Sequence, residues 1–149
     1  MSEELNKIAI ASDHAGYCLK EYLKKKLSEL GLEVSDYGTD SKESVDYPDM
    51  IHPVSRAVNE GTYAKAVIIC GSGNGVAMVA NKYPNVRAAL CWQPEIAALA
   101  RQHNNANIIA LPARFITEEM AAECVKVFIN TVFEGGRHQK RIDKIPNRS

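Results

Sequence analysis

Short apolar runs alternate along the chain with longer segments in which apolar residues recur every three or four positions. The runs are rich in isoleucine, valine and alanine, which is typical of strands buried inside a sheet. In the longer segments the repeat is helical: Leu19, Leu23 and Leu27 would form one stripe along a helix. The pattern predicts strands at residues 7–11, 32–34, 67–69, 87–91 and 107–111. It predicts helices at 17–30, 48–60, 76–80 and 94–102, and a fifth helix capped by Thr117.

Strands that alternate with helices predict a parallel sheet covered by helices on both faces. Five strands in this sequence suit the order 2-1-3-4-5, so we expect an α/β fold with three layers. The whole chain, 1–149, is expected to form one domain. A polar last stretch, 134–144, is expected to form a C-terminal helical extension. Ligands bind in such sheets where strands one and three diverge, which would bring the loops 12–16 and 70–75 together.

Composition excludes several classes of function. The hydrophobic content of 46% and the charged content of 24% are ordinary for a globular protein. The formal net charge of zero gives no support to nucleic-acid binding. The four cysteines show neither a metal-binding nor a redox spacing, so we expect free thiols in a reducing cytoplasm and no metal or other cofactor. The acidic N-terminus does not resemble a signal peptide, and no apolar segment is long enough to span a membrane.

The most distinctive stretch is the glycine loop CGSGNG at 70–75, between a predicted strand and a predicted helix. Backbone N–H groups in such a loop favour a phosphate group or a developing oxyanion. A thiol at the lip of the loop, as Cys70 would be, lies where the reactive thiolate form is favoured. The simpler alternative is a tight turn beside a buried cysteine.

This loop matches neither of the two common nucleotide-binding loops. A dinucleotide fingerprint has glycines spaced G-x-G-x-x-G, whereas the spacing here is G-x-G-x-G. A phosphate-binding loop of the nucleoside-triphosphate class has Gly-Lys-Ser/Thr after four intervening residues, and that sequence is missing here. We therefore expect neither a nicotinamide dinucleotide nor a nucleoside triphosphate.

Five motifs in order resemble ribose-5-phosphate isomerase type B. They are SDHAG at 12–16, VDYPD at 45–49, CGSGNG at 70–75, RQHNNAN at 101–107 and FEGGRHQKR at 133–141. The same family includes relatives that act on allose 6-phosphate, and the galactose-6-phosphate isomerase subunits. The resemblance implies a Rossmann-like α/β/α sandwich, and a homodimer or tetramer with active sites at the subunit interface. It also implies a cytoplasmic enzyme of the pentose phosphate pathway.

The family resemblance implies a role for fourteen residues. The catalytic residues would be Cys70, Ser72, His103 and Asp13. The substrate-binding residues would be His14, Tyr47, Gly71, Gly73, Asn74, Gly75, Asn104, Arg114, Arg137 and Arg141. One branch of the family lacks the cysteine and uses a glutamate just after the glycine loop; Val76 stands at that place, so the base is expected to be Cys70.

Within that set, the loop 71–75 would support the oxyanion with help from the hydroxyl of Ser72. His103 would open the sugar ring, with Asp13 as its partner at the sugar. The phosphate would be held by His14 and three arginines, of which Arg137 and Arg141 share a face of a helix. We expect the polar segment after 133 to reach a neighbouring subunit and to supply Arg137 and Arg141 to its site.

The simpler interpretations of the same residues remain open at this point. Taken alone, the Asp13 turn suits a helix cap, His103 suits a favourable contact with a helix dipole, and the basic tail suits a solvated face. His52 and His138 are interpreted as exposed polar residues. The cysteines at 18, 91 and 124 are expected to pack as small apolar side chains.

Three functions fit these observations. The first is a metal-independent isomerase that interconverts ribose 5-phosphate and ribulose 5-phosphate through an enediolate. The second is an isomerase of a six-carbon aldose phosphate, such as allose or galactose 6-phosphate. The third is a non-catalytic flavodoxin-like module that binds a phosphate.

Overall fold

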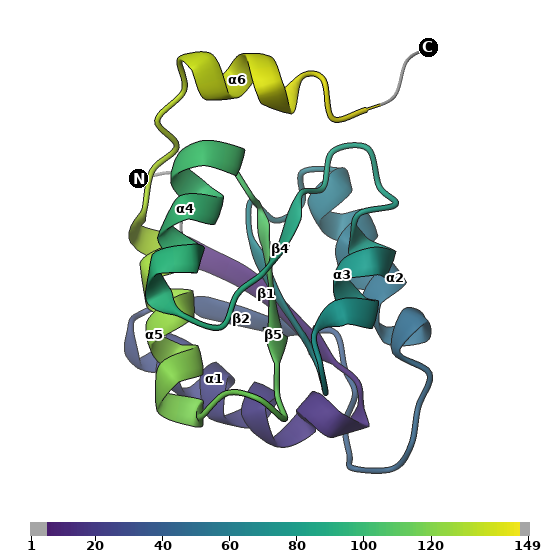
Figure 1. The fold of residues 1–149 in the computed structure, drawn as a ribbon. Coiled ribbons are helices and arrows are strands. Elements are labelled where there is room, and N and C mark those ends of the chain that lie inside the picture. The colour runs from purple at the N-terminus through teal and green to yellow at the C-terminus, as the bar shows by residue number, and fades with distance from the viewer. Residues whose placement is uncertain (1–5, 147–149) are drawn as a thin grey trace.

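Five parallel strands form the central sheet of the computed structural model, which describes residues 6–146 (Figure 1). The strands are β1 (Lys7–Ser12), β2 (Glu33–Asp36), β3 (Ala66–Cys70), β4 (Ala88–Leu90) and β5 (Ile108–Pro112). Every residue of β3 and β5 is buried, as the continuous apolar runs predicted. All four strand pairs run parallel, so the predicted α/β class with a parallel sheet is confirmed.

Helices cover both faces of this sheet and make the predicted three layers (Figure 1). One face packs against α1 (Tyr17–Glu29), α4 (Pro94–Asn104) and α5 (Glu118–Asn130). The other packs against α2 (Tyr47–Asn59) and α3 (Asn74–Ala80). The leucine stripe at 19, 23 and 27 is buried on the first face, and the Thr117 hydroxyl caps α5 by accepting from the Met120 N–H at 3.1 Å. These local signals therefore gave the correct elements.

The predicted strand order was wrong at one edge. The observed order is β2-β1-β3-β5-β4, whereas the sequence suggested that β4 would lie next to β3. The fully buried β5 occupies the inner position, while β4 has three half-buried residues and forms the edge. The position of β5 next to β3 matters for function. Cys70 pairs with Pro112, so the loop after β5 lies beside the glycine loop.

The C-terminal extension is helical, as predicted, and lies at the other end of the sheet. Helix α6 (Arg137–Ile142) packs near the end of α4, and the Glu134 N–H donates to the Gln102 carbonyl at 3.1 Å. Figure 1 shows α6 at the top, while the chain leaves β5 at the bottom. The carboxyl ends of the strands and the C-terminal helix thus mark opposite edges of the molecule.

None of the helices within residues 6–146 is long and apolar enough to cross a membrane. The acidic residues at the extreme N-terminus, on which the signal-peptide argument rested, lie outside the described part of the chain.

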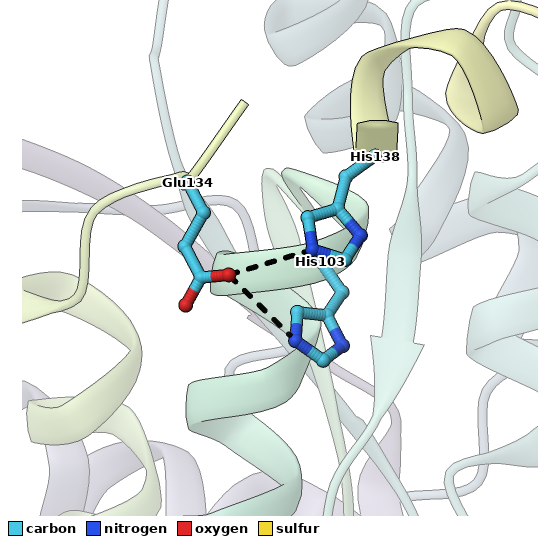
Figure 2. A group of neighbouring side chains, drawn as sticks. All are labelled: His103, Glu134 and His138. Atoms are coloured by element: carbon cyan, nitrogen blue, oxygen red, sulfur yellow. Dashed lines mark ion pairs between the residues drawn. The ribbon is translucent and has the colours of Figure 1, made fainter. Parts of the chain in front are cut away.

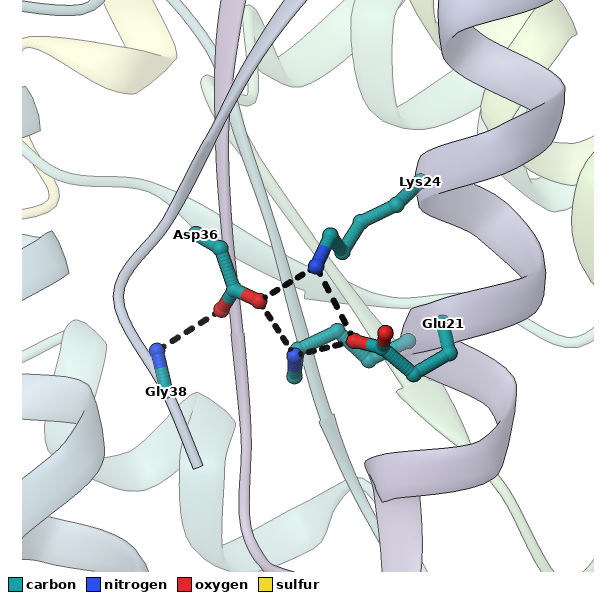
Figure 3. A network of polar contacts seen from close by, with 5 residues as sticks. Glu21, Lys24, Asp36 and Gly38 are labelled. Atoms are coloured by element: carbon teal, nitrogen blue, oxygen red, sulfur yellow. Dashed lines mark hydrogen bonds and ion pairs between the residues drawn. The ribbon is translucent and has the colours of Figure 1, made fainter. Parts of the chain in front are cut away.

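A network of two lysines and two acids joins α1 to β2 (Figure 3). Lys20 has a fully buried side chain, and its Nζ lies 2.6 Å from Asp36 Oδ2 and 2.8 Å from Glu21 Oε2. Lys24 Nζ contacts the same two oxygens at 2.8 Å and 3.1 Å. Asp36 Oδ1 accepts a hydrogen bond from the Gly38 N–H at 2.8 Å. The network provides the partners that a buried ammonium group requires.

Both acids of this network are held in their charged form. Burial pushes the pKa of Asp36 upward, but hydrogen bonds from Lys20 and Lys24 outweigh it, and the pKa lies below its ordinary value of 3.8. The hydrogen bond from Lys20 likewise holds the pKa of Glu21 below its ordinary value. A depressed carboxyl pKa stabilises the fold above the unfolded-state pKa, and this stabilisation is lost as the pH falls through the folded-state value.

Replacing Asp36 with asparagine is therefore expected to lower the free energy of unfolding at neutral pH. Lys20 loses its closest charged partner, which costs about 1.5–3 kcal/mol. The melting temperature would fall by roughly 3–12 °C for a chain of this size. Thermal unfolding from about pH 7 to about pH 3 measures the effect, and the difference from wild type should shrink at the acid end. Asp40→Asn, in an exposed loop, is the control; a difference that does not change with pH would contradict the assignment.

Candidate active site

The carboxyl ends of β1, β3 and β5 are tied to one another by backbone hydrogen bonds. The Asp13 N–H donates to the Ile69 carbonyl at 3.2 Å, which fixes the loop after β1 against β3. The N–H groups of Ala113 and Arg114 donate to the carbonyls of Cys70 and Gly71 at 2.9 Å and 3.0 Å, which fixes the loop after β5. The loops 12–16 and 70–75 thus meet at one edge, as the sequence predicted, and the corrected strand order adds a third loop.

A pocket of about 400 Å³ opens at this edge, which we call the cysteine edge. It is lined by Asp13, His14, Ala15, Tyr47, Cys70, Gly71, Ser72, Gly75, Arg114 and Phe115. Eight of these ten residues belong to the set that the family resemblance named. Gly73 and Asn74 belong to the same loop but do not line the pocket. Phe115, with 76% of its surface exposed, was missed; its position just after Arg114 was the available signal.

Because glycine has no side chain, the side chains of Arg114 and Tyr47 can lie directly against the backbone of the loop 71–75. A Cβ at Gly71 would lie 3.1 Å from Nη1 of Arg114, and a Cβ at Gly75 would lie 2.6 Å from the Tyr47 ring. Gly73 has φ +77°, in the left-handed region where side chains are disfavoured, and a Cβ there would also overlap Leu90. The loop therefore holds an arginine and a tyrosine against the backbone beside Cys70.

Cys70 is the last residue of β3, is 6% exposed and lines the pocket. Beside it, the Ser72 hydroxyl accepts a hydrogen bond from the Asn74 N–H at 3.3 Å, which shapes the loop. Two other cysteines differ from Cys70 in having no access to the pocket. Burial, with the neighbouring Cys124 thiol, raises the pKa of Cys91 to about 12. Burial, with Glu95 and Glu123 nearby, raises the pKa of Cys124 to about 11, so both remain protonated thiols.

The turn after β1 has a structural role as well as a place in the pocket. Asp13 Oδ1 accepts a hydrogen bond from the Gly16 N–H at 3.1 Å, so the helix-cap interpretation of Asp13 is correct, and Asp13 also lines the pocket. His14 Nδ1 accepts a hydrogen bond from the Val45 N–H at 3.2 Å. This bond leaves Nε2 of a neutral ring as the protonated nitrogen, which can donate to an anion. The VDYPD motif thus orients His14 through its backbone.

The remaining four residues of the implied site lie elsewhere in the chain. Helix α4 runs from the carboxyl ends of the strands back toward their amino ends, and His103 and Asn104 form its last residues. Arg137 and Arg141 lie on α6, next to the end of α4. A strand of five residues separates the two edges by about 13 Å of sheet. Within one chain, the structure therefore does not bring His103 together with Asp13 or Cys70.

A stack of two histidines marks this second edge, which we call the histidine edge (Figure 2). The rings of His103 and His138 are stacked, with centroids 4.2 Å apart and planes at 13°. Glu134 Oε1 lies 3.4 Å from His138 Nε2 and 3.9 Å from His103 Nε2. The expectation that His138 is exposed was wrong: only 7% of its surface is exposed, because α6 places it on the end of α4.

These three side chains are the only His, Cys, Asp or Glu group within residues 6–146 whose ligand atoms all lie within 4.8 Å of one another. Their geometry is a poor match for a metal ion. The nitrogen lone pairs of the two rings lie in separate, nearly parallel planes, so one ion cannot lie in both ring planes.

Two arginines that the sequence did not single out, the half-buried Arg87 and the buried Arg101, hold the turn after His103. The Arg87 guanidinium donates to the carbonyls of Asn104 and Asn105 at 2.9–3.1 Å. The Arg101 guanidinium donates to Asn105 Oδ1 at 2.9 Å and to the Ala106 carbonyl at 2.7 Å. Asn105 ends α4 in the left-handed conformation, at φ 47°. The end of α4 is therefore rigidly placed.

Two further expectations from the sequence were corrected. Cys18 is exposed and does not pack in the core, although Cys91 and Cys124 do. His52 is half-buried, and its Nδ1 lies 2.6 Å from the Tyr83 hydroxyl.

The sequence of the chain is similar to one family of known proteins over nearly its whole length. Residues 8–145 match the family model described as Ribose/Galactose Isomerase. Among curated proteins, ribose-5-phosphate isomerase B of Escherichia coli is 40% identical over 141 residues, which cover 95% of each chain.

Solved structures agree with the sequence comparison. The ribose 5-phosphate isomerase of Thermotoga maritima superposes with a TM-score of 0.92 at 50% identity, over 93% of this chain and 96% of that one. The ribose-5-phosphate isomerase B of Mycoplasma genitalium, with bound ribulose-5-phosphate, superposes with a TM-score of 0.90 at 43% identity, over 93% of each chain.

Proposed function

The chain belongs to the ribose/galactose isomerase family, and from that premise we propose that it interconverts ribose 5-phosphate and ribulose 5-phosphate. It is an isomerase, and the bound ketose phosphate of the related Mycoplasma genitalium enzyme supports this substrate. The observation in the molecule itself that carries the proposal is the cysteine edge. There a cysteine, a glycine loop and two side chains that can donate hydrogen bonds to an anion, His14 and Arg114, surround one pocket.

We assign the proton transfer to Cys70. Its thiolate takes the proton from C2 of the open-chain aldose, and the C–H electron pair forms the double bond of an enediolate with charge on O1. N–H groups of the loop 71–75, assisted by the Ser72 hydroxyl, support that oxygen. The proton on O2 then moves to O1, the thiol returns its proton to C1, and the C2 carbonyl forms. The two carbons exchange oxidation state within one molecule, so the step is balanced without a redox cofactor.

We assign the phosphate to His14 and Arg114 at the cysteine edge, together with Arg137 and Arg141. A guanidinium binds a phosphate through paired hydrogen bonds, which makes three arginines and a histidine a sufficient clamp for a dianion. Arg137 and Arg141 are exposed on α6 and lie across the sheet from His14. They can reach the same phosphate only if they come from a second copy of the chain.

We therefore propose that the enzyme is a homodimer, or a tetramer of two such dimers, with its sites at the subunit interface. Each site joins the cysteine edge of one subunit to the histidine edge of its neighbour. His103 then lies beside the sugar ring with Asp13 of the other subunit, and Asn104 binds a hydroxyl. This assembly accounts for the separation of the two halves of the implied site within one chain.

An assay of ribose 5-phosphate in the presence of a chelator tests the function. Ketose formation that resists the chelator is expected, since no proposed step uses a metal ion. The same assay with allose 6-phosphate and galactose 6-phosphate ranks five-carbon and six-carbon substrates by kcat/KM. Phosphate binding without any turnover of these substrates would overturn the proposal and favour a regulatory module.

A further inference from the structure

The histidine edge contains two groups that the proposed reaction leaves without a role, Glu134 and His138. The His103 side chain is 41% exposed, whereas that of His138 is 8% exposed and lies behind it in the stack. Glu134 is fixed beside them, because its N–H donates to the carbonyl of Gln102, the residue before His103. An accessible imidazole is thus backed by a buried one, with a carboxylate oxygen near Nε2 of both (Figure 2).

We propose that Glu134 and His138 are positioning residues that set the ring plane and the tautomer of His103 for opening of the sugar ring. The inference rests on the proposed function, because ring opening is a step of that reaction. It adds two residues that touch neither the reacting carbons nor Cys70. Their effect on the reaction would pass entirely through His103.

Ring opening makes demands on an imidazole that proton abstraction at C2 does not. The anomeric hydroxyl loses its proton, the bond between C1 and the ring oxygen breaks, and the ring oxygen gains a proton as the C1 carbonyl forms. One nitrogen of His103 can carry this proton from the hydroxyl to the ring oxygen, with no net gain or loss. That nitrogen must begin with a free lone pair and must point at the sugar.

The stack and the carboxylate meet both demands. A carboxylate oxygen beside Nε2 favours the tautomer in which that nitrogen carries the proton, which leaves the lone pair on Nδ1. The stack with His138 fixes the plane of the ring, so that Nδ1 points in one direction. The hydrogen bonds from Arg87 and Arg101 hold the turn that follows His103. Nδ1 of His103 therefore has a free lone pair and can act as the base, while Nε2 carries the proton and faces the Glu134 carboxylate.

Hydrogen exchange into ribulose 5-phosphate isolates ring opening from the other steps. Ribose 5-phosphate is mostly a closed ring, whereas ribulose 5-phosphate is open, because its phosphate occupies the hydroxyl that would close a five-membered ring. Exchange of a C1 hydrogen of ribulose 5-phosphate with deuterated water needs the same base and the same phosphate clamp. It does not need His103 as a ring-opening group, since the enediolate can take deuterium at C1 and return to the open-chain ketose.

Two variants test the proposal, and each keeps the helix packing. Glu134→Ala removes a side chain that is half exposed, and His138→Phe keeps the stacked ring but removes its nitrogens. Each should lower kcat/KM for net conversion about 10-fold in both directions, as the Haldane relation requires, while the rate of deuterium exchange at C1 of ribulose 5-phosphate changes by less than about 2-fold. Glu134→Gln keeps an oxygen near the rings and should recover part of the loss. Glu29→Ala is the matched control, because Glu29 is an exposed acid whose Oε2 likewise lies 3.9 Å from a side-chain nitrogen, Lys26 Nζ.

Equal losses of net conversion and of deuterium exchange would overturn the proposal, since damage to α6 or to the phosphate clamp affects both. Unchanged net conversion would also overturn it. Imidazole ¹⁵N shifts provide a readout that needs no turnover: wild-type His103 should be protonated on Nε2, and Glu134→Ala should lose that preference. An unaltered His103 spectrum would overturn the inference. Failure of the wild type to convert either sugar would instead contradict the proposed function.

Discussion

Replacing Cys70 with alanine is expected to lower kcat for ribose 5-phosphate by about 10²–10⁴-fold, the range for loss of a general base. KM should change little, because His14 and Arg114, the proposed phosphate-binding groups, keep their places in the pocket. Melting should be nearly unchanged, since Cys70 is a small side chain at a strand end. Steady-state kinetics on the purified variant measure both constants.

Hydrogen exchange gives a second measurement of the same assignment. In deuterated water the wild type should incorporate deuterium at the carbon that receives the proton, and Cys70→Ala should not do so above background. Cys18→Ala is the matched control, because Cys18 is exposed on α1 and lines no part of the pocket. Near-normal kcat in Cys70→Ala would mean that the base lies elsewhere, and Asp13 would be the next residue to test.

Loss of one arginine from α6 should lower kcat/KM for ribose 5-phosphate by about 10- to 150-fold. This factor corresponds to the free energy of one charge-assisted hydrogen bond. Arg137→Ala is the variant of choice, because Arg137 is exposed and its removal disturbs no packing. Mixing Arg137→Ala with Cys70→Ala should then restore activity if sites are shared. Random exchange would make about half of the dimers hybrid, each with one intact site, and would recover about a quarter of the wild-type activity.

A second mixture makes this result specific. Arg114 and Cys70 both belong to the cysteine edge, so a hybrid of Arg114→Ala and Cys70→Ala contains no intact site and should show no recovery of activity. Exchange itself can be followed with tagged subunits. A demonstrated exchange without recovery in the first mixture would mean that each site is built from one chain. Unchanged kcat/KM in Arg137→Ala alone would remove this arginine from the phosphate site.

The sequence predicted the helices and strands well because burial leaves a recognisable pattern of apolar residues. A half-buried helix has a repeat of three or four residues, and a fully buried strand has a continuous apolar run. The predicted strands 67–69 and 107–111 are apolar apart from Asn107 at the start of the second, and both proved to be central strands. The order of the last two strands was wrong because periodicity does not specify neighbours. The observed β4 is shorter and less buried than β5, a difference that the two predicted ranges, 87–91 and 107–111, did not show.

The site was predictable to a similar extent. Strands that end in a glycine loop and an Asp-His turn had to converge if they were neighbours, and they do. The separation of His103 from Cys70 also follows from topology, since a helix after a parallel strand returns to the amino ends. The burial of His138 does not follow from any local signal. It depends on how α6 packs on the end of α4, which is a contact between segments joined by a polar linker.

The placement of the two half-sites at opposite edges has a consequence for how the proposed enzyme responds to dilution. A folded monomer would contain every side chain that the reaction needs, but it would have no complete active site. Specific activity would then follow the mass-action equilibrium between monomer and dimer, and it would fall once the protein concentration drops below the dissociation constant. A substrate that bridges both edges would shift that equilibrium toward the dimer, so that saturating sugar phosphate protects the activity of a dilute sample.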